Sequence, residues 1–282
     1  MKDIMHNGMQ PGPIGIFDSG YGGLTIYREI QELLPQYSYL YLGDNARTPY
    51  GTRSFDVVYE FTRQCVKYLF SQGCHLVILA CNTASAKALR SIQQIDLPQI
   101  SSQKRVLGII RPTVECIGEV TTSRHVGVLA TEGTIKSNSY PLEIRKLFPD
   151  IVVTGEACPM WVPLVETCEH NSPGADYFIK RHIDNLLSRD SQIDTIILGC
   201  THYPMLIEKI KQYVPQGVKV LTQGAAVAAS LKNYLLRHPE MDALCSKGGE
   251  RVFCTTESDN RFREQASRFL EQHINVKHVT LD

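Results

Sequence analysis

Short apolar runs alternate with amphipathic segments along most of the chain. The runs lie at 14–19, 38–44, 75–80, 125–131, 151–157 and 193–199. Two of the segments between them show helical spacing, with apolar residues on one face: Val58, Phe61, Cys65, Tyr68 and Leu69 in the first, and Ile179, Ile183, Leu186 and Leu187 in the second. A further helix is predicted from Leu24 to Leu34, before Pro35. Apolar strands that alternate with helices predict parallel sheets covered by helices on both faces.

The two halves of the chain resemble each other. IGIFDSGYGGLT and VGVLATEGTIKS each begin a half, and Asp18 and Ala130 within them are 112 positions apart. Two further stretches, HLVILACNTASA at 75–86 and IDTIILGCTHYPML at 193–206, place Cys81 and Cys200 119 positions apart. These similar offsets indicate a duplication, and we expect two domains that face each other across a pseudo-twofold axis.

Each of the two cysteines lies where an apolar strand ends and a helix begins. In open α/β sheets the ligand crevice lies beyond the carboxyl ends of the strands. A thiol at a helix N-terminus is near the positive end of the helix dipole, which favours the thiolate and can lower the thiol pKa from about 8.5 toward 7. One such cysteine alone is more simply a packing residue. A matched pair with polar neighbours predicts two bases that reach one ligand from opposite sides.

Composition narrows the possible functions. The 282 residues, 43% of them hydrophobic, are enough for two domain cores. Lys plus Arg and Asp plus Glu number 29 each, so nucleic acid is not expected as a primary partner. The first residues, MKDIMHNGMQPGP, contain no apolar core of a secretory signal, and no run is long enough to cross a membrane. We therefore expect a soluble, cytoplasmic protein.

Neither a disulfide framework nor a metal site is expected. The nine cysteines are irregularly spaced and include no C-x-x-C pair. The Cys200-x-His202 pair offers two ligands, whereas a structural zinc ion needs four.

The turn GYGGLT does not match the nucleotide-binding patterns. Thr25 stands where G-x-G-x-x-G requires its third glycine. We expect the glycines at 20, 22 and 23 to let backbone N–H groups approach a small anion such as a carboxylate. Two polar residues near the turns, Asp18 and His202, could also serve as ordinary helix caps.

Six motifs in this order resemble those of the glutamate racemases, within the aspartate/glutamate racemase family: FDSGYGGLT, YLGDNARTPYG, ACNTASA, GVLATEGTIKSNSY, ACPMWVPLVE and LGCTHYPML. The tail VFCTTESDNRFREQASRFL is also similar to the end of that family. The resemblance implies a cofactor-independent enzyme that supplies D-glutamate for peptidoglycan. It implies two flavodoxin-like α/β domains, 1–110 with 223–282 and 111–222, with the active site in the cleft between them. It also implies a homodimer.

The resemblance further implies the residues of the site. The catalytic set would be Cys81, Cys200, Asp18, His202 and Glu166, with Cys81 removing the proton from D-glutamate and Cys200 from L-glutamate. The substrate would contact Asp18, Ser19, Tyr50, Gly51, Asn82, Thr83, Thr201 and His202. This chain has Thr222-Gln223-Gly224 where the family commonly has an Asp-Ser or similar pair, so the local hinge differs from the family pattern.

Two thiols at facing strand ends suit the inversion of an α-carbon, which requires a base on one face and an acid on the other. No electron-sink cofactor is evident, so the site itself would have to stabilise the carbanion with fixed donors and by excluding water. Two alternatives remain open. One is a related two-cysteine enzyme that acts on aspartate, a hydantoin or maleate. The other is a non-catalytic binding module or partner inhibitor that keeps the two-domain cleft.

Overall fold

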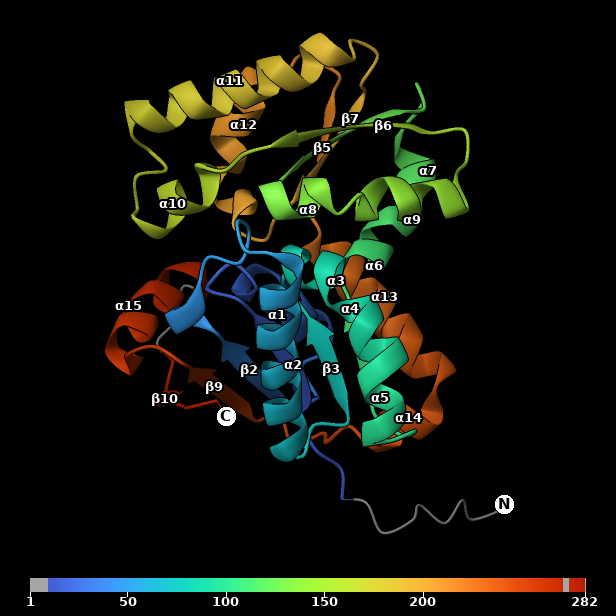
Figure 1. Ribbon diagram of the computed structural model, residues 1–282, viewed down its shortest axis with the longest axis vertical. Helices are drawn as coiled ribbons and strands as arrows, with labels where there is room; N and C mark the ends of the chain where they lie inside the picture. The colour runs from blue at the N-terminus through green and yellow to red at the C-terminus, as the bar shows by residue number, and fades with distance from the viewer. Residues whose placement is uncertain (1–9, 271–273, 282) are drawn as a thin grey trace.

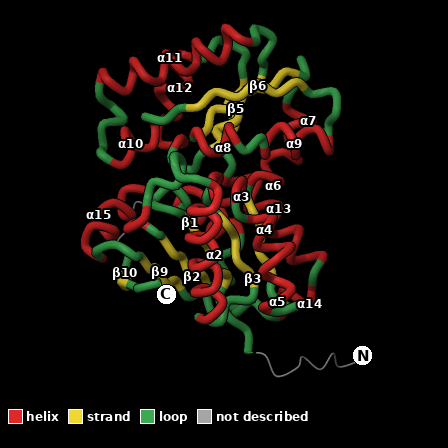
Figure 2. The backbone as a smooth tube through the Cα atoms, in the orientation of Figure 1, coloured by secondary structure: helices red, strands yellow, loops and turns green. Residues whose placement is uncertain are grey.

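The structure is a computed structural model that describes residues 10–270 and 274–281. The chain forms two lobes, one above the other in Figure 1, and each is built around a parallel sheet. The first sheet has the strand order β10-β9-β2-β1-β3-β4, and the second has the order β6-β5-β7-β8. In both lobes the strands lie between layers of helices (Figure 2). The predicted fold class, an α/β protein with two parallel sheets, is therefore confirmed.

The strands of the first sheet are β1 (Ile14–Asp18), β2 (Tyr39–Gly43), β3 (Leu76–Leu79), β4 (Arg105–Gly108), β9 (Arg251–Thr255) and β10 (Val276–His278). Those of the second sheet are β5 (His125–Ala130), β6 (Val152–Ala157), β7 (Thr195–Gly199) and β8 (Lys219–Leu221).

The helices before the second sheet are α1 (Leu24–Leu33), α2 (Phe55–Ser71), α3 (Asn82–Lys87), α4 (Leu89–Ser91), α5 (Leu97–Ile100), α6 (Ile110–Glu115) and α7 (Ile117–Val120). Those within it are α8 (Glu132–Lys136), α9 (Ser139–Leu147), α10 (Trp161–Glu166), α11 (Pro173–Arg189) and α12 (Ile207–Tyr213). The helices after it are α13 (Gly224–Arg237), α14 (Pro239–Ala243) and α15 (Asp259–Leu270). Short 3-10 turns span Asn45–Arg47 and Tyr203–Leu206, and a π-helical stretch spans Ile92–Asp96.

The two sheets repeat one strand order, as a duplication predicts. The order β2-β1-β3-β4 in the first sheet corresponds to β6-β5-β7-β8 in the second. Cys81 follows β3 and Cys200 follows β7, so the cysteines occupy equivalent positions. In the first sheet β1 lies between β2 and β3, and in the second sheet β5 lies between β6 and β7. This reversal of strand order is where open α/β sheets form their ligand crevice.

Alternate residues of each strand supply the cores on the two faces of its sheet. In the first sheet, Ile14 and Ile16 face a core built with α1, α13 and α15, whereas Phe17 faces a core built with α2 and α3. The predicted apolar face of α2 is confirmed, because Val58, Cys65 and Leu69 are buried there and Phe61 and Tyr68 pack against that core. In the second lobe α11 buries its predicted residues Ile179, Ile183 and Leu186, with Leu187 packed alongside.

The predicted elements agree with the structure to within one or two residues, but the patterns missed four strands. Three of these, β4, β8 and β10, are edge strands of three or four residues with partly exposed side chains. A strand so short and so exposed has no distinctive apolar pattern. The fourth, β9, has only three consecutive apolar residues.

The chain passes from the first lobe to the second after β4 and returns after β8. This path supports our proposed division into 1–110 with 223–282 and 111–222. Within those ranges, residues 1–9, 271–273 and 282 lie outside the part of the chain that the structure describes. Most of the segment 1–13, in which no secretory signal is expected, is therefore outside it. In the part of the chain that the structure describes, no helix is both long and apolar enough to cross a membrane.

Candidate active site

Residues just beyond β1, β3, β5 and β7 line one cavity at the boundary between the lobes. Its volume is about 130 Å³, and both Cys81 and Cys200 face it. Of the residues expected at the site, those that line the cavity are Ser19, Tyr50, Gly51, Cys81, Asn82, Thr83, Cys200, Thr201 and His202. The other two lie behind this lining: Glu166 contacts His202, and Asp18 directly precedes Ser19. The structure thus brings together all the residues expected from the sequence.

Cys81 is the N-cap residue of α3. Its Sγ accepts a hydrogen bond from the backbone N–H of Ala84 at 3.5 Å and lies 3.4 Å from Ser19 Oγ. Burial, together with the negative charge of Asp18, raises the pKa of the Cys81 thiol to about 12, against the smaller lowering effect of these hydrogen bonds. The expectation of a lowered pKa is therefore wrong for Cys81, because loss of solvent outweighs the helix terminus.

Cys200 has a histidine and a carboxylate behind it. His202 Nδ1 lies 3.9 Å from Cys200 Sγ, and His202 Nε2 lies 3.0 Å from Glu166 Oε1. Burial lowers the pKa of His202, but its contacts with Cys200 and Glu166 outweigh burial and raise this pKa to about 10. The raised pKa favours a protonated imidazole beside Cys200. His202 makes no side-chain hydrogen bond as a helix cap, so that alternative is not supported.

Asp18 ends β1 behind the glycine turn. Its Oδ2 accepts a hydrogen bond from the N–H of Gly20 at 2.9 Å, whereas its buried Oδ1 has no partner among the described residues. Burial raises the pKa of Asp18, and the positive charge of His202 opposes this shift. The N-cap residue of α1 is Gly23, and no side chain makes a capping hydrogen bond there, so the helix-cap interpretation is not supported for Asp18 either. Its hydrogen bond instead holds the glycine turn at Gly20.

The glycine turn is tightly packed against the Cys200 corner. A Cβ at Gly22 would lie 2.4 Å from His202 Nδ1 and 2.6 Å from Thr201 Oγ1, so no larger residue fits unless the corner moves. The Thr25 hydroxyl donates a hydrogen bond to Thr201 O at 3.1 Å. The first lobe therefore directly supports the backbone around the second cysteine.

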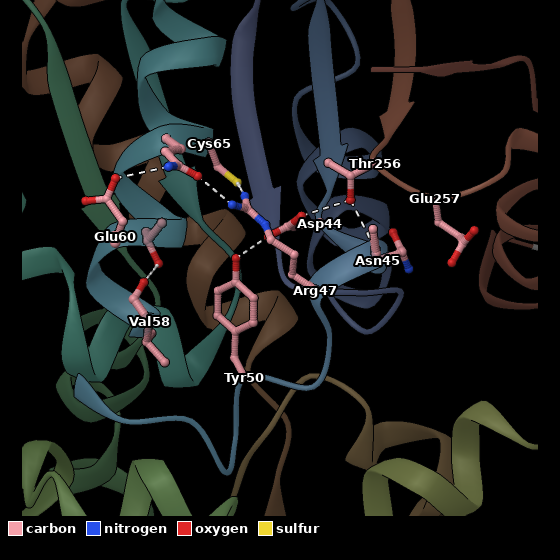
Figure 3. Close-up of polar contacts among 12 residues, drawn as sticks. Asp44, Asn45, Arg47, Tyr50, Val58, Glu60, Cys65, Thr256 and Glu257 are labelled. Atoms are coloured by element: carbon pink, nitrogen blue, oxygen red, sulfur yellow. Dashed lines mark hydrogen bonds and ion pairs between the residues drawn. The ribbon is translucent and has the colours of Figure 1, made fainter. Parts of the chain in front are cut away.

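Tyr50 lines the cavity, but its hydroxyl points away from it. That hydroxyl donates a hydrogen bond to Asp44, which also pairs with Arg47 and accepts from Thr256 (Figure 3). Gly51, the next residue, accepts a hydrogen bond from the N–H of Gly133 in the other lobe at 2.8 Å. The 50–51 segment can thus reach a ligand with its backbone and the Tyr50 ring, while Asp44 holds the ring.

Thr83 and Asn82 connect the first cysteine corner to the second lobe. Thr83 Oγ1 lies 3.0 Å from Thr131 Oγ1, and Asn82 Oδ1 accepts from the Tyr140 hydroxyl at 2.8 Å. Thr131 itself lines the cavity and is the N-cap of α8, but it is not among the residues expected from the sequence. The signal was available, because the GVLATEGT motif places Thr131 where the first half has Ser19.

The geometry suits proton transfer at a carbon atom. Each lobe contributes one thiol to the same cavity, and each thiol has an ionisable neighbour, Asp18 for Cys81 and His202 for Cys200. Among residues 10–270 and 274–281, no group of three or more His, Cys, Asp or Glu side chains is arranged to hold a metal ion. The fold and the site therefore define a two-lobed α/β protein in which two thiols, one from each lobe, line the same cavity.

Comparison with known proteins identifies the family. Residues 14–231 match the family model for Asp/Glu/Hydantoin racemase. A glutamate racemase from Ruegeria sp. is 38% identical over 93% of this chain and 97% of its own length. The crystal structure of a glutamate racemase isoform from Bacillus anthracis has a TM-score of 0.87 and 34% identity, covering 96% of this chain and 98% of that one. A glutamate racemase from Francisella tularensis, solved in complex with D-glutamate, has a TM-score of 0.83 and 33% identity over the same shares of the two chains.

This chain belongs to the Asp/Glu/Hydantoin racemase family. It is an enzyme of the amino-acid racemase class.

Proposed function

We propose that this enzyme interconverts L-glutamate and D-glutamate without a cofactor, using Cys81 and Cys200 as bases on opposite faces of the α-carbon. The observation that carries the proposal is that two cysteines at equivalent strand ends of two related lobes line one small cavity. The full-length similarity to glutamate racemases, including one solved with D-glutamate, supports glutamate as the substrate.

The cavity lining is suited to an acidic substrate. Hydroxyls come from Ser19, Thr83, Thr131 and Thr201. No lysine or arginine is among the described lining residues, and the carboxylate of Glu132, which is among them, is paired with Lys136. Backbone N–H groups at the starts of α3 and α8 add further donors beside it. Hydroxyl and backbone N–H groups are hydrogen-bond donors that can bind and orient the carboxylates of a substrate. Asp18 would lie behind the residues that contact the substrate. These residues would be Ser19, Tyr50 (through its ring), Gly51, Asn82, Thr83, Thr201 and His202.

Substrate binding would also create the base. A thiol with a pKa of about 12 is protonated in the free site, but the α-ammonium group of an amino acid brings a positive charge that favours a thiolate. One thiolate then removes the α-proton, and the opposite thiol donates a proton to the other face of the planar carbanion. Asp18 would set the protonation state of Cys81, and His202 would set that of Cys200. Glu166 would keep His202 protonated.

The α-hydrogen of an amino acid is a very weak acid, so the carbanion needs stabilisation. The same hydroxyl and N–H donors, already fixed around the substrate carboxylate, would stabilise the negative charge that develops on it. Hydrogen bonds between the lobes, such as those from Gly133 to Gly51 and from Thr25 to Thr201, would keep the cleft closed to bulk water.

We further propose that the enzyme acts in the cytoplasm, as a homodimer, and supplies D-glutamate for peptidoglycan. The resemblance of its six motifs to the glutamate racemases supports these three points.

Circular dichroism tests the substrate directly. Protein dialysed against a chelator should bring the ellipticity of either L-glutamate or D-glutamate to zero, because the enantiomers have equal free energies. Aspartate, a hydantoin and maleate serve as comparison substrates under the same conditions. Preferential turnover of one of these three would contradict the assignment to glutamate. So would a protein that turns over neither glutamate nor any of the three.

A further inference from the structure

Gln223 occupies the point at which the chain returns from the second lobe to the first. It lies between β8 and α13, and its side chain is 2% exposed. Although it is the N-cap residue of α13, its side chain makes no capping hydrogen bond. The amide group is therefore directed toward something other than its own helix.

The amide of Gln223 pairs with the amide of Asn82. Asn82 Nδ2 donates to Gln223 Oε1 at 2.6 Å, and Gln223 Nε2 lies 3.2 Å from Asn82 Oδ1. Gln223 Nε2 also lies 2.9 Å from Thr113 Oγ1 and 2.9 Å from the Tyr140 hydroxyl. Since Tyr140 in turn donates to Asn82 Oδ1, the four side chains form a closed network in which each amide has only one favourable orientation.

This network connects the two cysteine corners. Asn82 follows Cys81 directly and lines the cavity. The Tyr140 ring packs against the end of β7, since a Cβ at Gly199 would lie 3.1 Å from it. Burial and the nearby Cys200 raise the pKa of Tyr140, so its hydroxyl stays protonated and remains a donor. The orientation of Asn82 is thus determined jointly by both lobes and by the segment that joins them.

We infer that Gln223 is a positioning residue that orients the Asn82 amide toward the substrate and holds it at a fixed place relative to the second lobe. The inference rests on the proposed function, in which Asn82 contacts glutamate. Asn82 Nδ2 has two N–H groups, and the bond to Gln223 uses one of them. The other is left to bind substrate, with its direction set by the first. A buried amide without this partner would turn to find another one.

Replacement of Gln223 by alanine should raise the KM for both enantiomers of glutamate. We expect an increase of roughly five- to tenfold, the usual cost of misplacing one hydrogen bond, with a smaller change in kcat. Because L- and D-glutamate have equal free energies, kcat/KM must fall by the same factor in both directions.

A double mutant separates positioning from general destabilisation. If Gln223 acts through Asn82, adding Gln223→Ala to Asn82→Ala should change KM less than twofold. Thr62→Val is the matched control, because it removes a buried hydrogen bond from the Thr62 hydroxyl to Val58 O (2.7 Å) within α2, away from the cavity. The control should lower the melting temperature but leave KM unchanged. Fully multiplicative effects of the two alanine substitutions, or an equal rise of KM in the control, would overturn the inference.

A measurement that does not depend on activity is the hydrogen exchange of the Asn82 side-chain NH2. It can be followed by NMR with 15N-labelled asparagine, and the signal can be assigned with Asn82→Ala. The N–H that is bonded to Gln223 should be protected in the wild type and should exchange at least tenfold faster in Gln223→Ala. Equal exchange in both proteins would contradict the positioning role. A wild-type enzyme that fails to racemise glutamate would refute the proposed function, while this protection would still decide whether Gln223 orients Asn82.

Discussion

Cys200→Ser should lose racemisation of glutamate and yet continue to remove the α-proton from the D-enantiomer. Cys81→Ser should do the reverse. A substrate analogue that eliminates a leaving group after proton removal needs only the first base, whereas racemisation needs both. We expect racemisation to fall by a factor on the order of 10²–10⁴ in each mutant, the usual contribution of a positioned acid or base. Elimination from the enantiomer that faces the remaining thiol should change far less.

The assay is the elimination rate from the D- and L-analogues, measured beside racemisation by circular dichroism. Cys74→Ser is a suitable control because Cys74 is buried but does not line the cavity, and it should keep both activities. The opposite pairing of mutants and enantiomers would exchange the two faces without changing the mechanism. Equal loss of elimination from both enantiomers in either mutant would mean that the thiols are not separate bases.

Glu166→Gln should narrow the pH range of activity from the alkaline side. Glu166 Oε1 lies 3.0 Å from His202 Nε2, and together with Cys200 it raises the pKa of His202 to about 10 against the lowering effect of burial. Without the carboxylate, burial should bring this pKa down by roughly 1–3 units. If the imidazolium is needed beside Cys200, the alkaline limb of a bell-shaped kcat/KM profile should move down by the same amount. Its apparent pKa values belong to the coupled site as a whole.

The free energy of unfolding should depend on pH through the same histidine. The pKa of His202 in the folded protein lies above its unfolded value of about 6.5. The contribution of His202 to the free energy of unfolding is therefore fully present below pH 6.5 and is lost as the pH rises toward 10. The free energy of unfolding of the wild type should therefore fall more steeply over this range than that of Glu166→Gln. Glu169→Gln is the matched control, because it removes an exposed charge three residues away. An alkaline limb that is identical in wild type and Glu166→Gln would exclude this role for Glu166.

The repeated apolar runs and the matched cysteine corners were sufficient to predict the parallel sheets, the duplication and the meeting of Cys81 and Cys200. These features depend on local pattern and on the rule that ligand crevices form at the carboxyl ends of parallel strands. The specific set of polar residues around the thiols required the family resemblance, because residues such as Glu166 and Tyr50 lie far from the cysteines along the chain.

Other features could not be read from the sequence at all. The high pKa of Cys81 results from the burial of the whole corner beside Asp18, whereas local sequence shows only the helix terminus. The contacts of Gln223 likewise depend on three elements that meet only in the folded chain. The direction of the Tyr50 hydroxyl, toward Asp44 and away from the cavity, is a further example.

The most direct test of a two-base mechanism is the racemisation of L-glutamate by the wild-type enzyme in D2O, stopped early and analysed by mass spectrometry of the separated enantiomers. With two thiols on opposite faces, the D-glutamate formed should carry deuterium at the α-carbon, while the remaining L-glutamate should still carry protium. Product that retains the original α-proton, or substrate that exchanges as fast as product forms, would contradict it, because a single base would then serve both faces.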